Sequence, residues 1–171
     1  MSALEQLRIR KNPLEVELAL AGAPPRRVEL FLAEHGSHDF NRQRVLELLD
    51  QADSFLPGRD LETGEWESFN SHAVVWIGMS GSSIDAEGEG SGDELFEHRR
   101  SVRVELAAGD WLEGEVLYSA PDAGPRLVDH LNRVDHLNRK ERYFRLWRGD
   151  QVFLVNKEWV LRVVENGHGA E

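Results

Sequence analysis

Hydrophobic and polar residues alternate along the segment 102–118, VRVELAAGDWLEGEVLY. Its apolar residues fall on one side of an extended chain and its polar residues on the other, as in a half-buried strand pair. Ala-Gly-Asp at 108–110 favours a tight turn, because glycine adopts a positive φ without steric cost. The pattern predicts a β-hairpin. Gly114, in the middle of the return strand, predicts a sharp bend or a close approach of another backbone.

The N-terminal half carries a similar pattern. Alternation predicts strands at 14–20 and 28–32, and a short extended piece follows at 54–57. A strand is expected over 69–79, and its AVVWI core is apolar on both faces, which predicts burial on both sides. Between these strands, an i, i+3, i+4, i+7 stripe predicts a helix over about 41–52, formed by Val45, Leu48, Leu49 and Ala52.

The same element order recurs in the C-terminal half. Strands are predicted at 101–107 and 111–119, and a helix from Pro125 onward. A strand at 143–147 and a long strand at 152–164 complete the unit.

Four sequence blocks also recur in the same order. They are VEL at 16–18 and 104–106, RVLELLD at 44–50 and RLVDHLN at 126–132, SFLPGRD at 54–60 and YFRLWRGD at 143–150, and FNSHAVVWI at 69–77 and VNKEWVLRV at 155–163. We interpret the repeat as an internal duplication. The predicted fold class is α+β, mostly β, with two pseudo-symmetric β-β-α-β-β lobes, each a small bent sheet or partial barrel with one helix. The predicted boundaries are 13–79 for the first lobe, 80–98 for an acidic Gly/Ser-rich flexible linker and 99–165 for the second lobe.

The hexapeptide VDHLNR occurs at 128–133 and again at 134–139. Six residues make about 1.67 helical turns, so the apolar stripe winds around a helix that contains both copies. Two readings stay open. The repeat is a neutral duplication in a tolerant helix, or the two copies compete for one place in the core and give a register switch.

Composition narrows the function classes. The chain has 171 residues, of which 40% are hydrophobic and 30% charged, as in an ordinary protein with a buried core. The absence of cysteine excludes disulfides, thiol nucleophiles and thiolate metal sites. A net charge of −11 disfavours general nucleic-acid binding, which needs clustered Lys and Arg. The longest apolar run, 73–77, is too short to span a bilayer, so we expect no membrane partner and a cytoplasmic location.

Candidate catalytic and metal-binding motifs are few. His35, His38 and Asp39 form an H-x-x-H-D cluster, which we interpret as exposed loop residues in preference to a zinc site. No G-x-S-x-G nucleophile motif is present. The Gly-rich stretch at 86–92 carries acids where a phosphate site needs neutral amides. We therefore predict no catalytic residue, no cofactor and no metal, and a protein that is not an enzyme.

Charge is distributed unevenly. Residues 126–148 hold seven Arg or Lys against three acids. This segment is either a solvated helix face beside the acidic linker or a docking patch for an acidic protein partner. The candidate partner-binding residues are Arg126, Arg133, Arg139, Lys140, Arg142, Arg145, Trp147 and Trp159.

The pattern V-x-V-x-L-x-x-G-x-x-x-x-G at 102–114 resembles the first motif of the Sm-like barrels. The block order over 101–165 resembles an uncharacterised family of small bacterial β-rich domains with Sm-like character, a resemblance that implies no known activity. The first hypothesis is a non-enzymatic interaction or regulatory module that binds a protein partner through strand edges and the basic helix, with a homo-oligomer as a further possibility. The alternative is an Sm-like RNA-binding assembly. An enzyme with paired carboxylates is a third hypothesis, which rests on composition alone.

Overall fold

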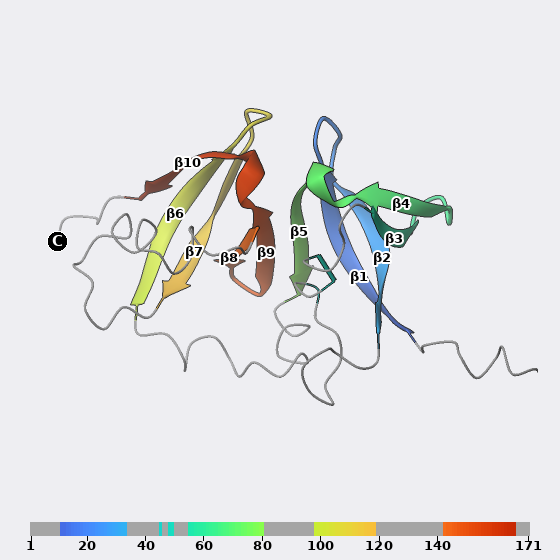
Figure 1. Ribbon diagram of the computed structural model, residues 1–171. Coiled ribbons are helices and arrows are strands. Elements are labelled where there is room, and N and C mark those ends of the chain that lie inside the picture. Colours follow the sequence, from blue (N-terminus) through green and yellow to red (C-terminus); the bar gives the residue numbers. More distant parts are fainter. Residues whose placement is uncertain are drawn as a thin grey trace, which may run out of the picture.

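A computed structural model describes residues 11–33, 45, 48–49, 55–80, 98–118 and 142–166. These residues form one antiparallel sheet of ten strands (Figure 1). The strands are β1 (Lys11–Leu20), β2 (Arg26–Ala33), β3 (Phe55–Asp60), β4 (Trp66–Asn70), β5 (Val74–Ser80), β6 (His98–Leu106), β7 (Trp111–Tyr118), β8 (Tyr143–Arg148), β9 (Gln151–Asn156) and β10 (Val160–Glu165). Two 3-10 turns, η1 (Ser71–Ala73) and η2 (Lys157–Trp159), precede β5 and β10.

The strand order is β10-β6-β7-β8-β9-β5-β1-β2-β3-β4. It contains the same arrangement twice, as β5-β1-β2-β3-β4 in the first half and β10-β6-β7-β8-β9 in the second. The two halves meet where β5 pairs with β9, from Trp76 opposite Val155 to Ser80 opposite Gln151. We call this pairing the seam. Figure 1 shows the halves side by side with β5 and β9 adjacent.

The predicted fold class is wrong. The structure has a single continuous sheet and not two β-β-α-β-β lobes. The last strand expected in each half is divided in two by a 3-10 turn, by η1 between β4 and β5 and by η2 between β9 and β10. Each half therefore has five strands, and the additional strand allows one half to pair with the other. In the described part of the chain, the only α-helical residues are Val45, Leu48 and Leu49. The rest of the helix expected over 41–52 lies outside the described residues, as do the helix expected from Pro125, both VDHLNR copies and most of the expected linker. The domain boundaries stay a prediction.

The two 3-10 turns have the same construction. The side-chain oxygen of Asn70 accepts a hydrogen bond from the backbone N–H of His72 at 3.0 Å. Asn156 accepts one from the N–H of Glu158, also at 3.0 Å. An Asn at this position satisfies a backbone donor that the short turn leaves without an internal partner. The blocks at 69–77 and 155–163 therefore occupy equivalent structural positions.

The predicted match between the two VEL blocks is out of register by two residues. The N–H of Ala21 donates to the carbonyl of Ala73 in the first half, and the N–H of Ala107 donates to that of Trp159 in the second. The residues at the ends of β1 and β6 are therefore equivalent, and Val16 corresponds to Val102. The short identical motif arises from alternation, which many strands share.

Two apolar clusters form the core, one in each half, and both include residues from across the seam. Tyr143, Val152 and Leu154 of the second half belong to the cluster of the first half. Ala19 and Val75 of the first half belong to the cluster of the second. Successive residues of β9 alternate between the clusters, as expected for a strand buried on both faces. The predicted burial of both faces of AVVWI is confirmed in β5, where Val74, Val75 and Ile77 are buried.

Gly114 allows two strands to approach closely, as predicted. A Cβ atom at this position would lie 2.5 Å from the carbonyl oxygen of Trp147 and 2.7 Å from Cγ of Leu146. Real Cβ atoms do not tolerate such distances, so the β7–β8 contact requires glycine.

Candidate functional site

The predicted basic patch is described only in part. Arg126, Arg133, Arg139 and Lys140 lie outside the described residues, so their role in partner binding stays a prediction. The other four residues are described: Arg142 precedes β8, Arg145 and Trp147 lie on β8, and Trp159 lies in η2.

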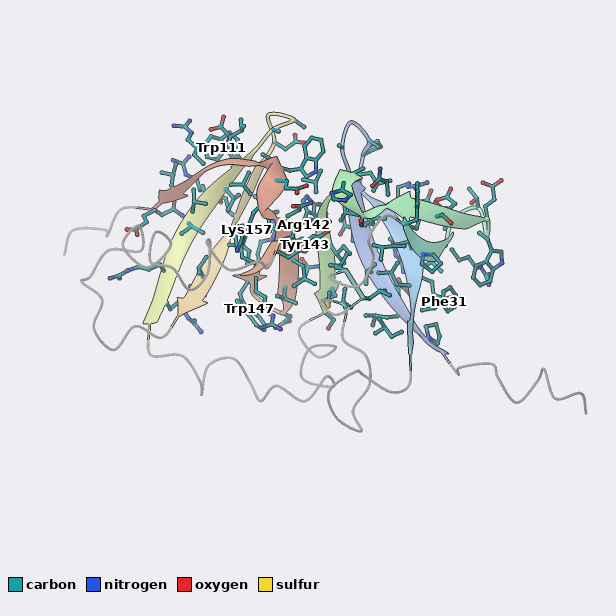
Figure 2. All side chains as sticks on the ribbon, viewed as in Figure 1. Phe31, Trp111, Arg142, Tyr143, Trp147 and Lys157 are labelled. Carbon is teal, nitrogen blue, oxygen red and sulfur yellow. The ribbon has the colours of Figure 1, made fainter. Side chains whose placement is uncertain are left out.

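Arg142 lies at the seam. Its Nε atom is 3.8 Å from Oε1 of Glu158, and its side chain is 27% exposed. Figure 2 shows Arg142 and Tyr143 on the side of the second half that faces the first. Arg145 is half-buried on β8, and Trp147 on the same strand packs against the apolar cluster of the first half.

Trp159 connects the two halves directly. Its indole N–H donates to the carbonyl of His72 at 2.7 Å, and its ring packs against the apolar cluster of the second half. The sequence pointed to this residue because it lies near the basic segment and because exposed tryptophans often anchor interfaces. Its observed role is at the seam.

Three of the four carbonyls between Ser71 and Val74 accept hydrogen bonds from side chains of the second half. The donors are Tyr143 Oη to Ser71 at 3.2 Å, Trp159 Nε1 to His72 at 2.7 Å and Asn156 Nδ2 to Val74 at 2.8 Å. A tight turn leaves its carbonyls directed outward, and buried carbonyls without partners are costly. Side chains of β8, β9 and η2 thus satisfy the carbonyls of η1 and the start of β5.

A further side-chain contact crosses the seam. Nδ1 of His72 lies 3.6 Å from Oε2 of Glu158. Both side chains are about half exposed, at 50% and 53%, so solvent screens this contact.

An apolar cleft of about 810 Å³ opens at the end of the seam where the β1–β2 and β6–β7 turns lie. Figure 1 shows both hairpin tips at this end of the sheet. Among the described residues that line it, Asp110 is the only one with an ionisable side chain. The lining also includes three tryptophans, Trp76, Trp111 and Trp159. Trp111 is further enclosed by the guanidinium groups of Arg103 and Arg162, at 5.3 and 5.2 Å from its ring centroid.

The sheet ends in two outer strands, β4 and β10. Among the described strands, β4 pairs with β3 alone and β10 with β6 alone. Large apolar side chains are exposed on or beside these edges: Phe55 is 59% exposed, Trp66 68% and Leu161 62%. Trp66 is stacked on Phe31 of β2, with ring centroids 5.0 Å apart (Figure 2 labels Phe31). Exposed apolar residues on an unpaired strand are typical of an interaction surface.

The outer edge of β4 has identifiable backbone donors. The N–H of Asp60 donates to the carbonyl of Glu65, which makes this pair the hydrogen-bonded type. Hydrogen-bonded and non-hydrogen-bonded pairs alternate along an antiparallel ladder. The backbone groups of Trp66, Ser68 and Asn70 therefore face away from β3, toward the open side.

The same reasoning applies to β10. The N–H of Asn166 donates to the carbonyl of Ser101, so alternate residues Glu165 and Val163 direct their backbone groups away from β6. Among the described strands, none pairs with these outward backbone groups of β4 and β10.

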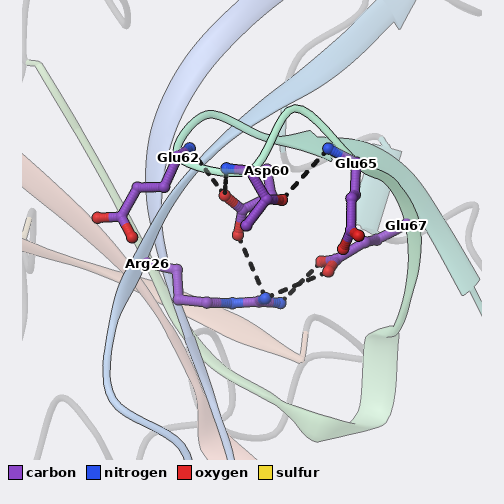
Figure 3. Close-up of polar contacts among 6 residues, drawn as sticks. Arg26, Asp60, Glu62, Glu65 and Glu67 are labelled. Carbon is purple, nitrogen blue, oxygen red and sulfur yellow. Dashed lines mark hydrogen bonds and ion pairs between the residues drawn. The ribbon is translucent and has the colours of Figure 1, made fainter.

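The β3–β4 hairpin is braced by an ionic cluster (Figure 3). Arg26 contacts Glu67 with both terminal nitrogens, at 2.9 and 3.3 Å, and Asp60 at 3.3 Å. Asp60 also accepts hydrogen bonds from the N–H groups of Glu62 and Thr63, at 2.8 and 2.9 Å. The hydrogen bond from Thr63 is the main cause that lowers the pKa of Asp60 below its ordinary value. The hydrogen bond from Glu62 and the charge of Arg26 lower this pKa further, whereas burial of the carboxylate raises it. This cluster supports the β4 edge.

Sequence reasoning did not identify Tyr143, Asn156, Trp76 or Trp111 as important. A usable signal was present for Asn156, because it aligns with Asn70 in the matched blocks. The predicted His35 and His38 cluster lies outside the described residues. Within those residues, no group of three His, Asp or Glu is placed to hold a metal ion. No helix in the same part of the chain has the length and apolar character needed to cross a membrane.

Comparisons with protein-family models, curated proteins and solved structures found no match to this chain. The resemblance to Sm-like barrels therefore stays a prediction.

Proposed function

We propose that this protein is a non-enzymatic interaction module that binds another protein by adding a strand to β4 or β10. The observation that carries the proposal is the exposure of Phe55, Trp66 and Leu161 at two edges with outward backbone donors. An added strand would satisfy the backbone groups and cover the apolar side chains at the same time. Backbone hydrogen bonds supply affinity in such complexes, and side-chain contacts supply specificity.

The seam supports this mode of binding. β5 and β9 form a five-residue ladder in which each strand covers the apolar cluster of the other half. The chain thus already contains one association of the proposed kind. The basic segment at 126–148 remains a predicted second contact for an acidic partner.

Proline variants on the edges test the proposal. Ser68→Pro removes an outward N–H of β4 without removing a donor to β3, and Val163→Pro does the same on β10. Glu67→Pro is the matched control that breaks the internal ladder. We expect one edge variant to lose the partners that the wild type binds. In the wild type, a bound partner should slow hydrogen exchange at the outward amides of the same edge. A recovered partner that binds both folded edge variants with wild-type affinity would contradict the proposal.

A further inference from the structure

We propose that the added strand comes from a second copy of this chain, with β10 of one molecule paired antiparallel to β4 of the next. This inference rests on the proposed function and names its partner. The repeated strand order supports this pairing. β4 has the position in the first half that β9 has in the second, and β10 has the position that β5 has. The two free edges are therefore counterparts of the two strands that already pair at the seam.

The exposed apolar residues of β3 and β4 occupy positions that are buried at the seam. Phe55 pairs with Asn70 as Tyr143 pairs with Asn156, and Tyr143 is only 4% exposed. Trp66 precedes Asn70 by the same interval as Val152 precedes Asn156, and Val152 is fully buried. Both seam residues belong to the apolar cluster of the opposite half. A second molecule would give Phe55 and Trp66 the same kind of cover.

The β10 edge likewise exposes apolar residues whose counterparts on β5 are buried. Leu161 follows η2 as Val75 follows η1, and it is 62% exposed where Val75 is 7% exposed. Val160 and Val163 correspond to Val74 and Ile77 of β5, which are fully buried. Val160 and Val163 themselves are only partly buried, because no described strand covers the outer side of β10.

Because β10 corresponds to β5 and β4 to β9, the register of the seam also predicts which residues of β10 and β4 pair between molecules. At the seam, Gly78 lies opposite Phe153, between the pairs Ile77–Leu154 and Met79–Val152. The corresponding contact between molecules places Val164 opposite Glu67. The flanking pairs are Val163 with Ser68 and Glu165 with Trp66, which are the residues whose backbone groups face outward on each edge.

Some side-chain contacts of the seam would recur between molecules. Asn70 corresponds to Asn156, so its amide can donate to the carbonyl of Val160 as Asn156 donates to Val74. His72 and Glu158 occupy equivalent positions, so they would face each other again with their roles exchanged.

Other contacts would be lost. Phe55 lacks the hydroxyl of Tyr143, Ala73 lacks the indole of Trp159, and Ser68 replaces the apolar Leu154. The contact between molecules is therefore weaker than the seam and reversible. The net charge of −11 also opposes self-association, so added salt strengthens it.

The contact is heterologous, since different surfaces of the two molecules meet. Each dimer retains one free β4 and one free β10, so association continues until the rotation between molecules closes a ring or the copies form a filament.

Engineered cysteines test the register, and the chain contains no cysteine of its own. Oxidation of a mixture of Glu67→Cys and Val164→Cys should give a heterodimer, because these positions form a non-hydrogen-bonded pair with a Cα separation suited to a disulfide. Val163→Cys is the matched control, because adjacent strand residues point to opposite faces of the sheet. We expect at least about fivefold more mixed dimer with Val164→Cys than with Val163→Cys.

Sedimentation velocity over a concentration series supplies the second measurement. The wild type should show a sedimentation coefficient that rises with concentration, and Ser68→Pro and Leu161→Lys should remove this rise. If a proline variant does not fold, Leu161→Lys and Trp66→Lys still test the edges, because both alter exposed side chains.

Equal cross-linking in the two mixtures, together with a constant sedimentation coefficient, would overturn self-association. The proposed function would survive that result if the edge variants still lost a different protein partner. It would fail only if partners bound the edge variants as they bind the wild type.

Discussion

The indole N–H of Trp159 donates to the carbonyl of His72, so a side chain on the second 3-10 turn completes the first one across the seam. Together with Asn156 and Tyr143, this bond ties the two halves through the backbone of η1. The seam therefore depends on a small set of side chains as well as on strand pairing.

Replacement of Trp159 with Phe should lower the free energy of unfolding by about 1 kcal/mol, because it removes this hydrogen bond and retains most of the aromatic packing. Urea denaturation followed by circular dichroism measures the change. Trp111→Phe is the control, since Trp111 also lines the cleft and donates no hydrogen bond among the described residues. An equal loss in both variants would show that the bond to His72 contributes nothing specific.

The two capping asparagines give a matched pair within one chain. Asn70→Ala should cost about 1 kcal/mol, the usual value for a lost cap. Asn156→Ala should cost about 2 to 3 kcal/mol, because it also leaves the carbonyl of Val74 without its seam donor in a buried site. Chemical denaturation of both variants measures the difference. Equal losses would contradict the role of Asn156 in joining the halves.

Gly114→Ala should destabilise the protein by about 2 kcal/mol or more, because the new methyl group would overlap the backbone of Trp147. Glu113→Ala, at the neighbouring exposed position of β7, should change stability by less than about 0.5 kcal/mol. Thermal unfolding of the two variants provides the comparison. A well-tolerated alanine at position 114 would mean that β7 and β8 separate easily.

The stability contributed by Asp60 should depend on pH in the acid range. Its pKa is lower in the folded protein than its ordinary value of 3.8, so folding favours the charged form. This contribution is fully present above the ordinary pKa and is lost as the pH falls through the lowered one.

The stability difference between wild type and Asp60→Asn should therefore be largest near neutral pH and should shrink below about pH 4. Urea unfolding at a series of pH values measures it, and Asp110→Asn controls for the change in net charge. A difference that stays constant with pH would show that the carboxylate charge is not involved.

Local sequence patterns predicted much of the strand content. Alternation over 102–118 predicted the β6–β7 hairpin and its turn. Gly114 predicted a sharp bend or a close backbone approach, and the structure shows the approach of β8. These features depend on residues near one another in sequence, so they are readable without a fold. The basic and aromatic residues proposed for partner binding were found by composition, and their role stays a prediction.

The division of each long C-terminal strand was not predicted. Asn70 and Asn156 each start a 3-10 turn within an otherwise apolar run, and one Asn between strand-forming residues is a weak local signal. The two-residue shift of the VEL blocks was missed for a related reason. Any alternating strand matches another at several registers, and only the bonds of Ala21 and Ala107 decide between them.

The sequence by itself determined a β-rich chain, two recurring sets of elements and a strand buried on both faces, because these properties follow from the local order of apolar and polar residues. Only the tertiary structure decided that the halves share one sheet. That outcome depends on which edge of β5 pairs with which edge of β9. It also depends on side-chain donors that satisfy the carbonyls of η1 from more than 70 residues away along the chain. Such long-range pairing leaves no periodic trace in the sequence. It nevertheless determines which two strands, β4 and β10, end the described sheet.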